Sequence, residues 1–221
     1  MASTQIKVNG QKLSTVTSFQ YLGSVITDEG SKPEILTRIA QTTAALTRLK
    51  PIWDDRSVSL SSKVRLMRSL VTSIFMYACE SWTLTAELQR RIQAMDSMEM
   101  RCYLKILYIS YKDYVTNEEV CAKIKQTVGP HEDDLTIVKR CKLQQYGHVS
   151  CSSGLAKTIL QGTVKGGRRQ GRQRKRWEDN IREWTGLELG RSQRAVENRK
   201  KMEKAGCKII CGAPTTLAVK G

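Results

Sequence analysis

Long apolar runs and an apolar N-terminal signal are absent from this sequence of 221 residues. No apolar run approaches the ~20 residues that a membrane-spanning helix needs. The first residues, Met-Ala-Ser-Thr-Gln-Ile-Lys, lack the apolar core of a secretory signal. We therefore expect an intracellular protein with no membrane partner.

Cysteine motifs and catalytic constellations are also missing. The seven cysteines are unevenly spaced and include no Cys-x-x-Cys pair. Cys141, His148 and Cys151, with His131 upstream, come nearest to a metal-binding set, but their spacing fits no common zinc module. Neither a Ser/His/Asp arrangement nor a phosphate-binding Gly-x-x-x-x-Gly-Lys-Ser/Thr loop occurs. We predict reduced thiols, no catalytic residues, no metal and no cofactor, and we assign His148 to a helix cap or to the core.

Acidic residues are scarce, since 21 Asp and Glu stand against 37 Lys and Arg, for a net charge of +16. The densest group of cations, which we term the basic run, contains no acid between residues 165 and 176. Its members are Lys165, Arg168, Arg169, Arg172, Arg174, Lys175 and Arg176. The planar guanidinium groups of arginine match phosphate oxygens, and three interspersed glycines make the backbone flexible. The run predicts contact with RNA, RNA–DNA hybrid or DNA, with Trp177 as the best base-stacking candidate. A solvated loop or a nuclear-import signal is the alternative.

The spacing of the apolar residues, with the turn and cap motifs, predicts a mainly α fold with a small N-terminal β element. Asn9-Gly10 between two short alternating segments indicates a hairpin, and further strands are expected up to about residue 28. Phe19 and Tyr21 lie at strand spacing, so they either line the strand core or contact a nucleic acid.

Helical signals follow the β element. A Ser31-x-x-Glu34 capping box predicts a helix that ends at Pro51, followed by a loop over 52–56. Apolar residues at three- and four-residue steps, Leu70 and Ala78 among them, predict one nearly buried helix over 60–82, with Trp82 in the core. The remaining helices are expected from Thr85, from a Thr116–Glu119 capping box, over 132–146 with Gly147 as terminator, over Trp177–Trp184, and over 191–204.

These signals divide the chain into four parts. We expect a β element at 1–30, a helical domain at 31–110, a small helical unit at 111–160, and a basic segment with short helices and a disordered tail at 161–221.

Five segments together resemble the C-terminal part of non-LTR (LINE-type) retrotransposon reverse transcriptases, most closely the RTE-like group. They are FQYLGSVI at 19–26, SLVTSIFMYACESWTL at 69–84, DYVTNEEV at 113–120, KLQQYGHV at 142–149 and GRRQGRQRKRWEDNI at 167–181. The resemblance implies that Tyr21, Leu22 and Gly23 form a turn like the primer grip at the end of the palm. The helices that follow would be a thumb, which packs on a template–primer duplex by shape and phosphate contacts.

The resemblance also implies that the polymerase carboxylates are missing. The family holds two metal ions on an Asp pair in the palm, and a further Asp lies upstream. Asp54-Asp55 lies in the predicted inter-helix loop and Asp133-Asp134 at a predicted helix start, so neither pair fits that role.

We therefore expect a non-catalytic, nuclear, nucleic-acid-binding fragment. Its exposed apolar face would bind a second copy or the missing palm. The alternatives are an active RNA-directed DNA polymerase component and a basic helical remnant without a dedicated function.

Overall fold

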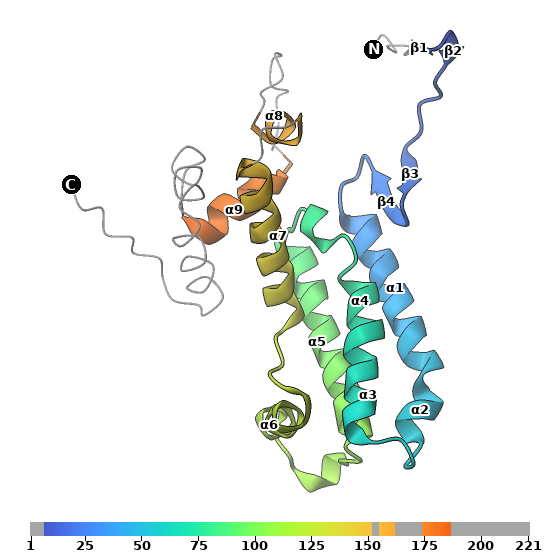
Figure 1. Ribbon diagram of the computed structural model, residues 1–221, viewed down its shortest axis with the longest axis vertical. Coiled ribbons are helices and arrows are strands. Elements are labelled where there is room, and N and C mark those ends of the chain that lie inside the picture. Colours follow the sequence, from blue (N-terminus) through green and yellow to red (C-terminus); the bar gives the residue numbers. More distant parts are fainter. Residues whose placement is uncertain (1–6, 152–154, 162–173, 187–221) are drawn as a thin grey trace, which may run out of the picture.

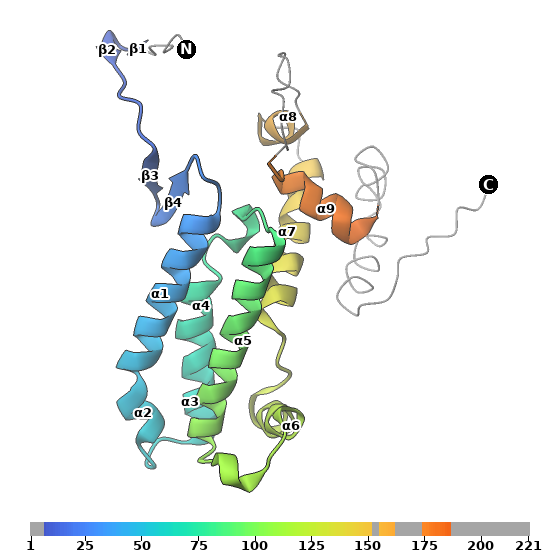
Figure 2. The same ribbon diagram turned by 180° about the vertical axis from the view of Figure 1, so that it is seen from behind.

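The computed structural model describes residues 7–151, 155–161 and 174–186, and the chain is mainly helical with a small N-terminal β element. Three helical segments lie side by side as an up-down-up bundle (Figures 1 and 2): α1 (Lys32–Arg48), the segment of α3 (Leu60–Leu66) and α4 (Ser73–Phe75), and α5 (Ala86–Ile106). The other helices are α2 (Lys50–Asp54), α6 (Asn117–Val128), α7 (Asp134–Cys151), α8 (Leu155–Gln161) and α9 (Trp177–Thr185). None of the described helices is both long and apolar enough to cross a membrane.

The β element consists of two separate antiparallel hairpins. β1 (Lys7–Val8) pairs with β2 (Gln11–Lys12), and β3 (Ser18–Tyr21) pairs with β4 (Ser24–Thr27). The predicted Asn9-Gly10 turn is confirmed, because both residues have positive φ, 50° and 79°. Leu22 and Gly23 repeat this geometry with φ of 48° and 82°. Two-residue hairpin loops with this twist require positive φ at both positions.

The start of α1 differs from the predicted capping box. The Ser31 side chain does not cap the helix, and its hydroxyl instead accepts a hydrogen bond from the Thr83 backbone N–H at 2.8 Å. The Glu34 carboxylate accepts from the Val25 N–H at 2.5 Å and pairs with Arg38 at 2.6 Å. Residues outside the motif therefore bind both side chains that the predicted capping box would have used.

The predicted stop at Pro51 and the loop after it are wrong in detail. α1 ends at Arg48, and Pro51 lies in the first turn of α2, where the missing N–H of proline costs nothing. Trp53 is buried, and its indole N–H donates to the Leu46 carbonyl at 3.3 Å. This contact helps to keep residues up to Asp54 helical.

The predicted single helix over 60–82 is interrupted. A π-helical turn at Met67–Thr72 follows α3, α4 ends at Phe75, and Ala78 adopts the left-handed conformation before a 3-10 turn at Cys79–Ser81. A π-helical turn contains more residues than an α-helical turn, so it rotates the side chains that follow it about the helix axis. Leu70, expected in the core, is consequently 45% exposed.

The downstream helix starts follow the sequence signals. Thr85 caps α5 by accepting from the Leu88 N–H, and Thr116 and Glu119 form the predicted capping box of α6. α9 coincides with the predicted Trp177–Trp184 helix. Gly147 does not end α7, which continues to Cys151 because Tyr146 and Ser150, on either side of the glycine, are buried. The helix expected over 191–204 lies outside the described residues.

The buried apolar residues of the bundle form two main clusters. An upper cluster joins α1, α4, α5 and α7 around Ile35, Phe75, Trp82 and Ile92, and confirms Trp82 as a core residue. A lower cluster joins α2, α3, α5 and α6. α6 and α7 thus share their cores with the residues before position 110.

Candidate nucleic-acid interface

α9, the helix that directly follows the basic run, is fixed to the bundle by a buried asparagine. The side chain of Asn180 is fully buried and bonds to both backbone groups of Leu84, each at 2.8 Å. Its oxygen also accepts from the Lys142 ammonium at 2.8 Å. One side chain therefore joins α9, α7 and the segment before α5.

Lys142 on α7 is the second buried group of this contact. Its Nζ also donates to the Trp82 carbonyl at 2.6 Å and lies 4.7 Å from the Trp177 ring centre. Burial, and the neighbouring Lys175, lower the pKa of Lys142 to about 7. Lys142 is fully buried and its Nζ is bonded to two protein oxygens, so it acts within this contact and is not exposed to a phosphate.

Trp177 serves as an anchor of α9. Its indole N–H donates to the Glu80 carbonyl at 2.7 Å, and its ring lies 6.4 Å from that of Tyr146. Ile181 adds an apolar contact to the same cluster. Three of the segments that carry the family resemblance therefore meet here. The predicted base-stacking role of Trp177 stays a prediction, and these contacts occupy its N–H and part of its ring.

The last three cations of the basic run are described, and they directly precede α9. Arg174 is exposed and donates to the Asp28 carbonyl at 2.6 Å. Lys175 pairs with Glu183 at 2.5 Å, and Arg176 is exposed while its backbone N–H donates to Asp179. Lys165, Arg168, Arg169 and Arg172 lie outside the described residues.

The Tyr21-Leu22-Gly23 turn protrudes from the bundle but is tied to it. The Leu22 carbonyl accepts from the Tyr77 hydroxyl, and the Gly23 carbonyl accepts from Arg38 at 2.5 Å. The Arg38 guanidinium lies 4.4 Å from the Tyr77 ring centre. These contacts fix the backbone of the turn and leave its side chains free.

The side chains of the hairpin point to solvent. Phe19, Tyr21, Leu22 and Ile26 are all more than half exposed. The strand-core interpretation of Phe19 and Tyr21 is therefore wrong in the described chain, because the two-stranded hairpin has no layer packed on it.

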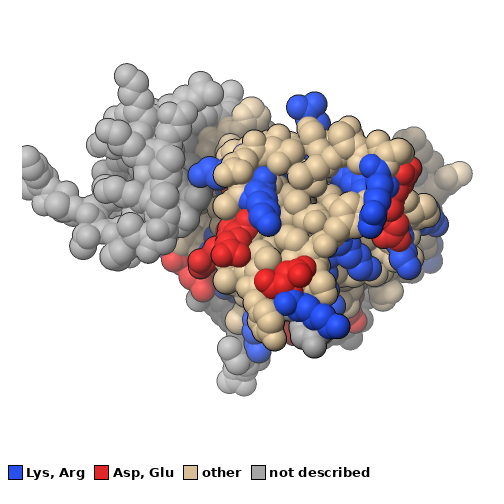
Figure 3. All heavy atoms as spheres, turned by 90° about the horizontal axis from the view of Figure 1, so that it is seen from below, with Lys and Arg blue, Asp and Glu red and all other residues tan. Residues whose placement is uncertain are grey.

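The hairpin and the start of α9 lie at the same end of the molecule (Figure 1). The hydrogen bond from Arg174 to the Asp28 carbonyl, just after β4, connects them directly. The opposite end, seen in Figure 3, has Lys and Arg interspersed with Asp and Glu. The charge at that end is mixed, whereas the basic run contains no acid.

Among the described side chains, the candidates His131, Cys141 and His148 are not brought together as a metal site. His148 is exposed within α7, so it is neither a cap nor a core residue as expected. His131 packs edge-on against Tyr103, with ring centres 5.6 Å apart. Cys141 instead packs against the core cluster that contains Cys79, and the Cys79 thiol beside it lowers the pKa of Cys141.

Sequence reasoning missed a convergence of acidic side chains. Asp133 behaves as a helix cap, accepting from the Thr136 N–H at 2.9 Å, but Asp134 turns inward toward α5. There it meets Asp96 and Glu99, which are spaced i, i+3 on one helical face. That spacing was readable from the sequence, whereas the approach of Asp134 was not.

Comparisons of the chain with protein-family models, with curated proteins and with solved structures found no match.

Proposed function

We propose that this chain binds RNA or RNA–DNA hybrid through phosphate contacts made by the basic run. The observation that supports this most is the fixed position of α9. Asn180, Lys142 and Trp177 seat the helix on the bundle, so the run enters a rigid body at Arg174. Cations fixed at one end can bind phosphates with a smaller loss of conformational entropy than cations on a free tail.

The chemistry of the run favours phosphate over an acidic protein. Five of its seven cations are arginines, whose planar forks bind phosphate oxygens in pairs. Of the three cations of the run that the structure describes, Lys175 forms an ion pair with an acidic residue. Arg174 and Arg176 are exposed and form no such pair with a described residue, so their charges are available to phosphates. Phosphate contacts carry no sequence information, and we expect binding that tolerates any sequence.

We further propose that the chain corresponds to the thumb and following segment of a non-LTR retrotransposon reverse transcriptase and has no polymerase activity of its own. The resemblance of the five segments supports this assignment, and the helical bundle with a preceding hairpin is compatible with it. Magnesium-dependent primer extension by the purified chain, above a mock preparation, would contradict the non-catalytic part.

The exposed hairpin side chains suggest a second contact. We propose that Phe19, Tyr21, Leu22 and Ile26 pack against the palm of such a polymerase, which would bury their apolar surface. In isolation the chain should self-associate through them. Sedimentation velocity should show dimers that disappear when Phe19 and Leu22 become serine, and a monomer at all concentrations would contradict the proposal.

The basic run is tested by charge reversal. Replacing Arg172, Arg174, Lys175 and Arg176 with glutamate changes the net charge from +16 to +8. Each lost phosphate contact should lower the slope of log K against log salt by about one, so the variant should lose most of its affinity and of its salt dependence. Helical content by circular dichroism should stay unchanged.

A matched control reverses four exposed cations on α5 and α6, far from α9: Arg101, Lys105, Lys123 and Lys125. This control has the same net charge as the run variant, and we expect it to keep most of its affinity. Filter binding to single-stranded RNA and to an RNA–DNA hybrid, across a salt series, measures both variants. If only the control loses affinity, the binding surface lies on the helices and not on the basic run.

A further inference from the structure

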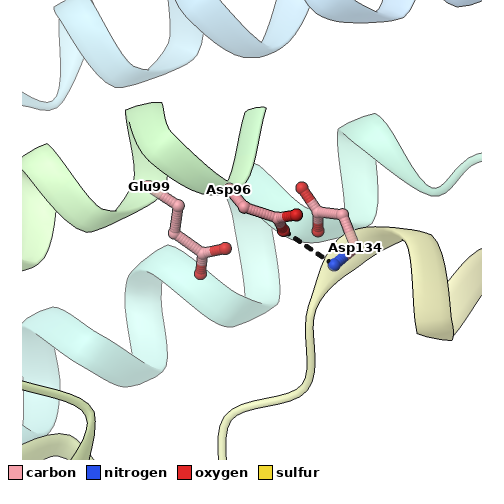
Figure 4. Close-up of side chains that lie close together, drawn as sticks. All are labelled: Asp96, Glu99 and Asp134. Carbon is pink, nitrogen blue, oxygen red and sulfur yellow. Dashed lines mark hydrogen bonds between the residues drawn. The ribbon is translucent and has the colours of Figure 1, made fainter. Parts of the chain in front are cut away.

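Three carboxylates meet where α5 passes the start of α7. Asp96 and Glu99 project from neighbouring positions on α5, and Asp134 is the first residue of α7 (Figure 4). One oxygen from each side chain lies within 4.8 Å of the others. We term these three residues the carboxylate cluster.

Asp134 has no partner that explains its burial. The residue is 4% exposed, its carboxylate points at that of Asp96, and only its backbone N–H is bonded, to Asp96 at 2.8 Å. Within the described residues its carboxylate accepts no hydrogen bond and joins no ion pair. Glu99, Asp96 and Asp133 lie nearby and place further negative charge beside it. A buried carboxylate in this setting needs a proton or a cation.

The other two members keep oxygens available. Glu99 accepts one hydrogen bond through its Oε1, from the Tyr103 hydroxyl at 2.7 Å. Asp96 accepts one from the Asp134 N–H and has its pKa raised, first of all by burial. Within the described residues no Lys or Arg forms an ion pair with Asp96, Glu99 or Asp134.

A small cavity adjoins the cluster. It measures about 10 Å³ and is lined by Glu99 and Asp134 on one side and by apolar groups such as Met67, Phe75 and Met95. A cavity of this size is near the minimum that can hold one water molecule. A water there would supply a further oxygen beside the two carboxylates.

We propose that the carboxylate cluster binds one hard divalent cation of the size of Ca²⁺, which links α5 to α7. Such ions take only oxygen ligands, at about 2.3–2.6 Å, so two ligands of one ion lie at most about 5 Å apart. The 4.8 Å spread of the cluster fits this limit. Mg²⁺ binds at about 2.0–2.1 Å and demands a closer, octahedral set, so it should bind more weakly.

The site can be observed directly with Tb³⁺, a hard ion that replaces Ca²⁺ and emits when a nearby aromatic ring is excited. Tyr103, bonded to Glu99, is in position to sensitise it. We expect saturable emission at one ion per chain, displaced by Ca²⁺ and less readily by Mg²⁺. Ca²⁺ at a hundredfold excess over its Kd should raise the Tm by about 5–10 °C.

Asp134→Asn should reduce the Tb³⁺ affinity at least tenfold and abolish the effect of Ca²⁺ on the Tm. Because the variant removes a buried charge, we expect it to fold and, in EDTA, to be at least as stable as the parent chain. Asp133→Asn is the matched control, since asparagine still caps α7 and the residue lies outside the cluster. It should retain both responses.

Two outcomes would overturn the site. If Asp134→Asn and the parent chain bind Tb³⁺ equally, the emission arises elsewhere on the surface. If Asp134→Asn is more stable in EDTA while Ca²⁺ leaves the parent Tm unchanged, the cluster holds a shared proton and no cation. All measurements are made without nucleic acid, so they do not depend on the proposed function.

Discussion

Replacing Asn180 with alanine should loosen α9 from the bundle without changing any charge. The amide makes three buried hydrogen bonds of 2.8 Å, two to Leu84 and one to Lys142. Alanine removes the side-chain partner of both Leu84 backbone groups and one of the two hydrogen bonds of Lys142, which keeps its bond to the Trp82 carbonyl. Leu84 and Lys142 are both fully buried. Each unsatisfied buried group costs about 1–3 kcal/mol, and relaxation shares part of that loss. We expect a loss of about 3–5 kcal/mol in the stability of this contact.

The assay combines a thermal melt with hydrogen exchange at a single amide. The Leu84 N–H donates to Asn180, so its exchange should accelerate in Asn180→Ala, while amides in the lower half of α5 keep their protection. Gln145→Ala on α7 is the control, because it removes an exposed neutral amide from a helix. Its melt and exchange should match the parent chain.

The same variant also tests the proposed function. If the fixed start of α9 positions the basic run, Asn180→Ala should weaken RNA binding although all seven cations remain. A variant with unchanged Tm and unchanged Leu84 exchange would refute the structural reasoning. If α9 is loosened in the variant but the RNA affinity is unchanged, the basic run binds RNA without being positioned by α9.

Three further outcomes follow from buried polar groups. Glu34→Gln should cost about 3–5 kcal/mol by stranding the buried Arg38 charge, measured by urea unfolding. The pKa of Lys142 is lowered from 10.5 to about 7 in the folded chain, so between these two pH values the unfolded chain binds more protons than the folded chain. The stability of the parent chain, measured relative to Lys142→Met, should therefore rise with pH from about 7 to about 10. The Cys79 thiol lowers the pKa of Cys141, so alkylation of Cys141 should proceed at a lower pH than for an ordinary thiol and should slow in Cys79→Ala, as mass spectrometry would show.

The local signals of the sequence predicted the helical class and several element starts correctly. Asn9-Gly10 forms the predicted turn, Thr116 forms the predicted capping box, and Thr85 lies at the predicted start of a helix. Such motifs act through backbone groups only two or three residues away. The prediction that Trp82 is a core residue is confirmed. The capping box at Ser31 failed because Thr83, distant in the sequence, bonds to its hydroxyl instead.

The sequence by itself determined the charge of the basic run and the amphipathic helix that follows it, because composition and periodicity are properties of the chain alone. Only the tertiary structure decided what holds that helix in place. Asn180 and Lys142 are ordinary polar residues in the sequence, and they act together because α7 and α9 pack against the segment before α5. The meeting of Asp134 with Asp96 and Glu99 likewise depends on helix packing, which brings side chains 38 residues apart into contact.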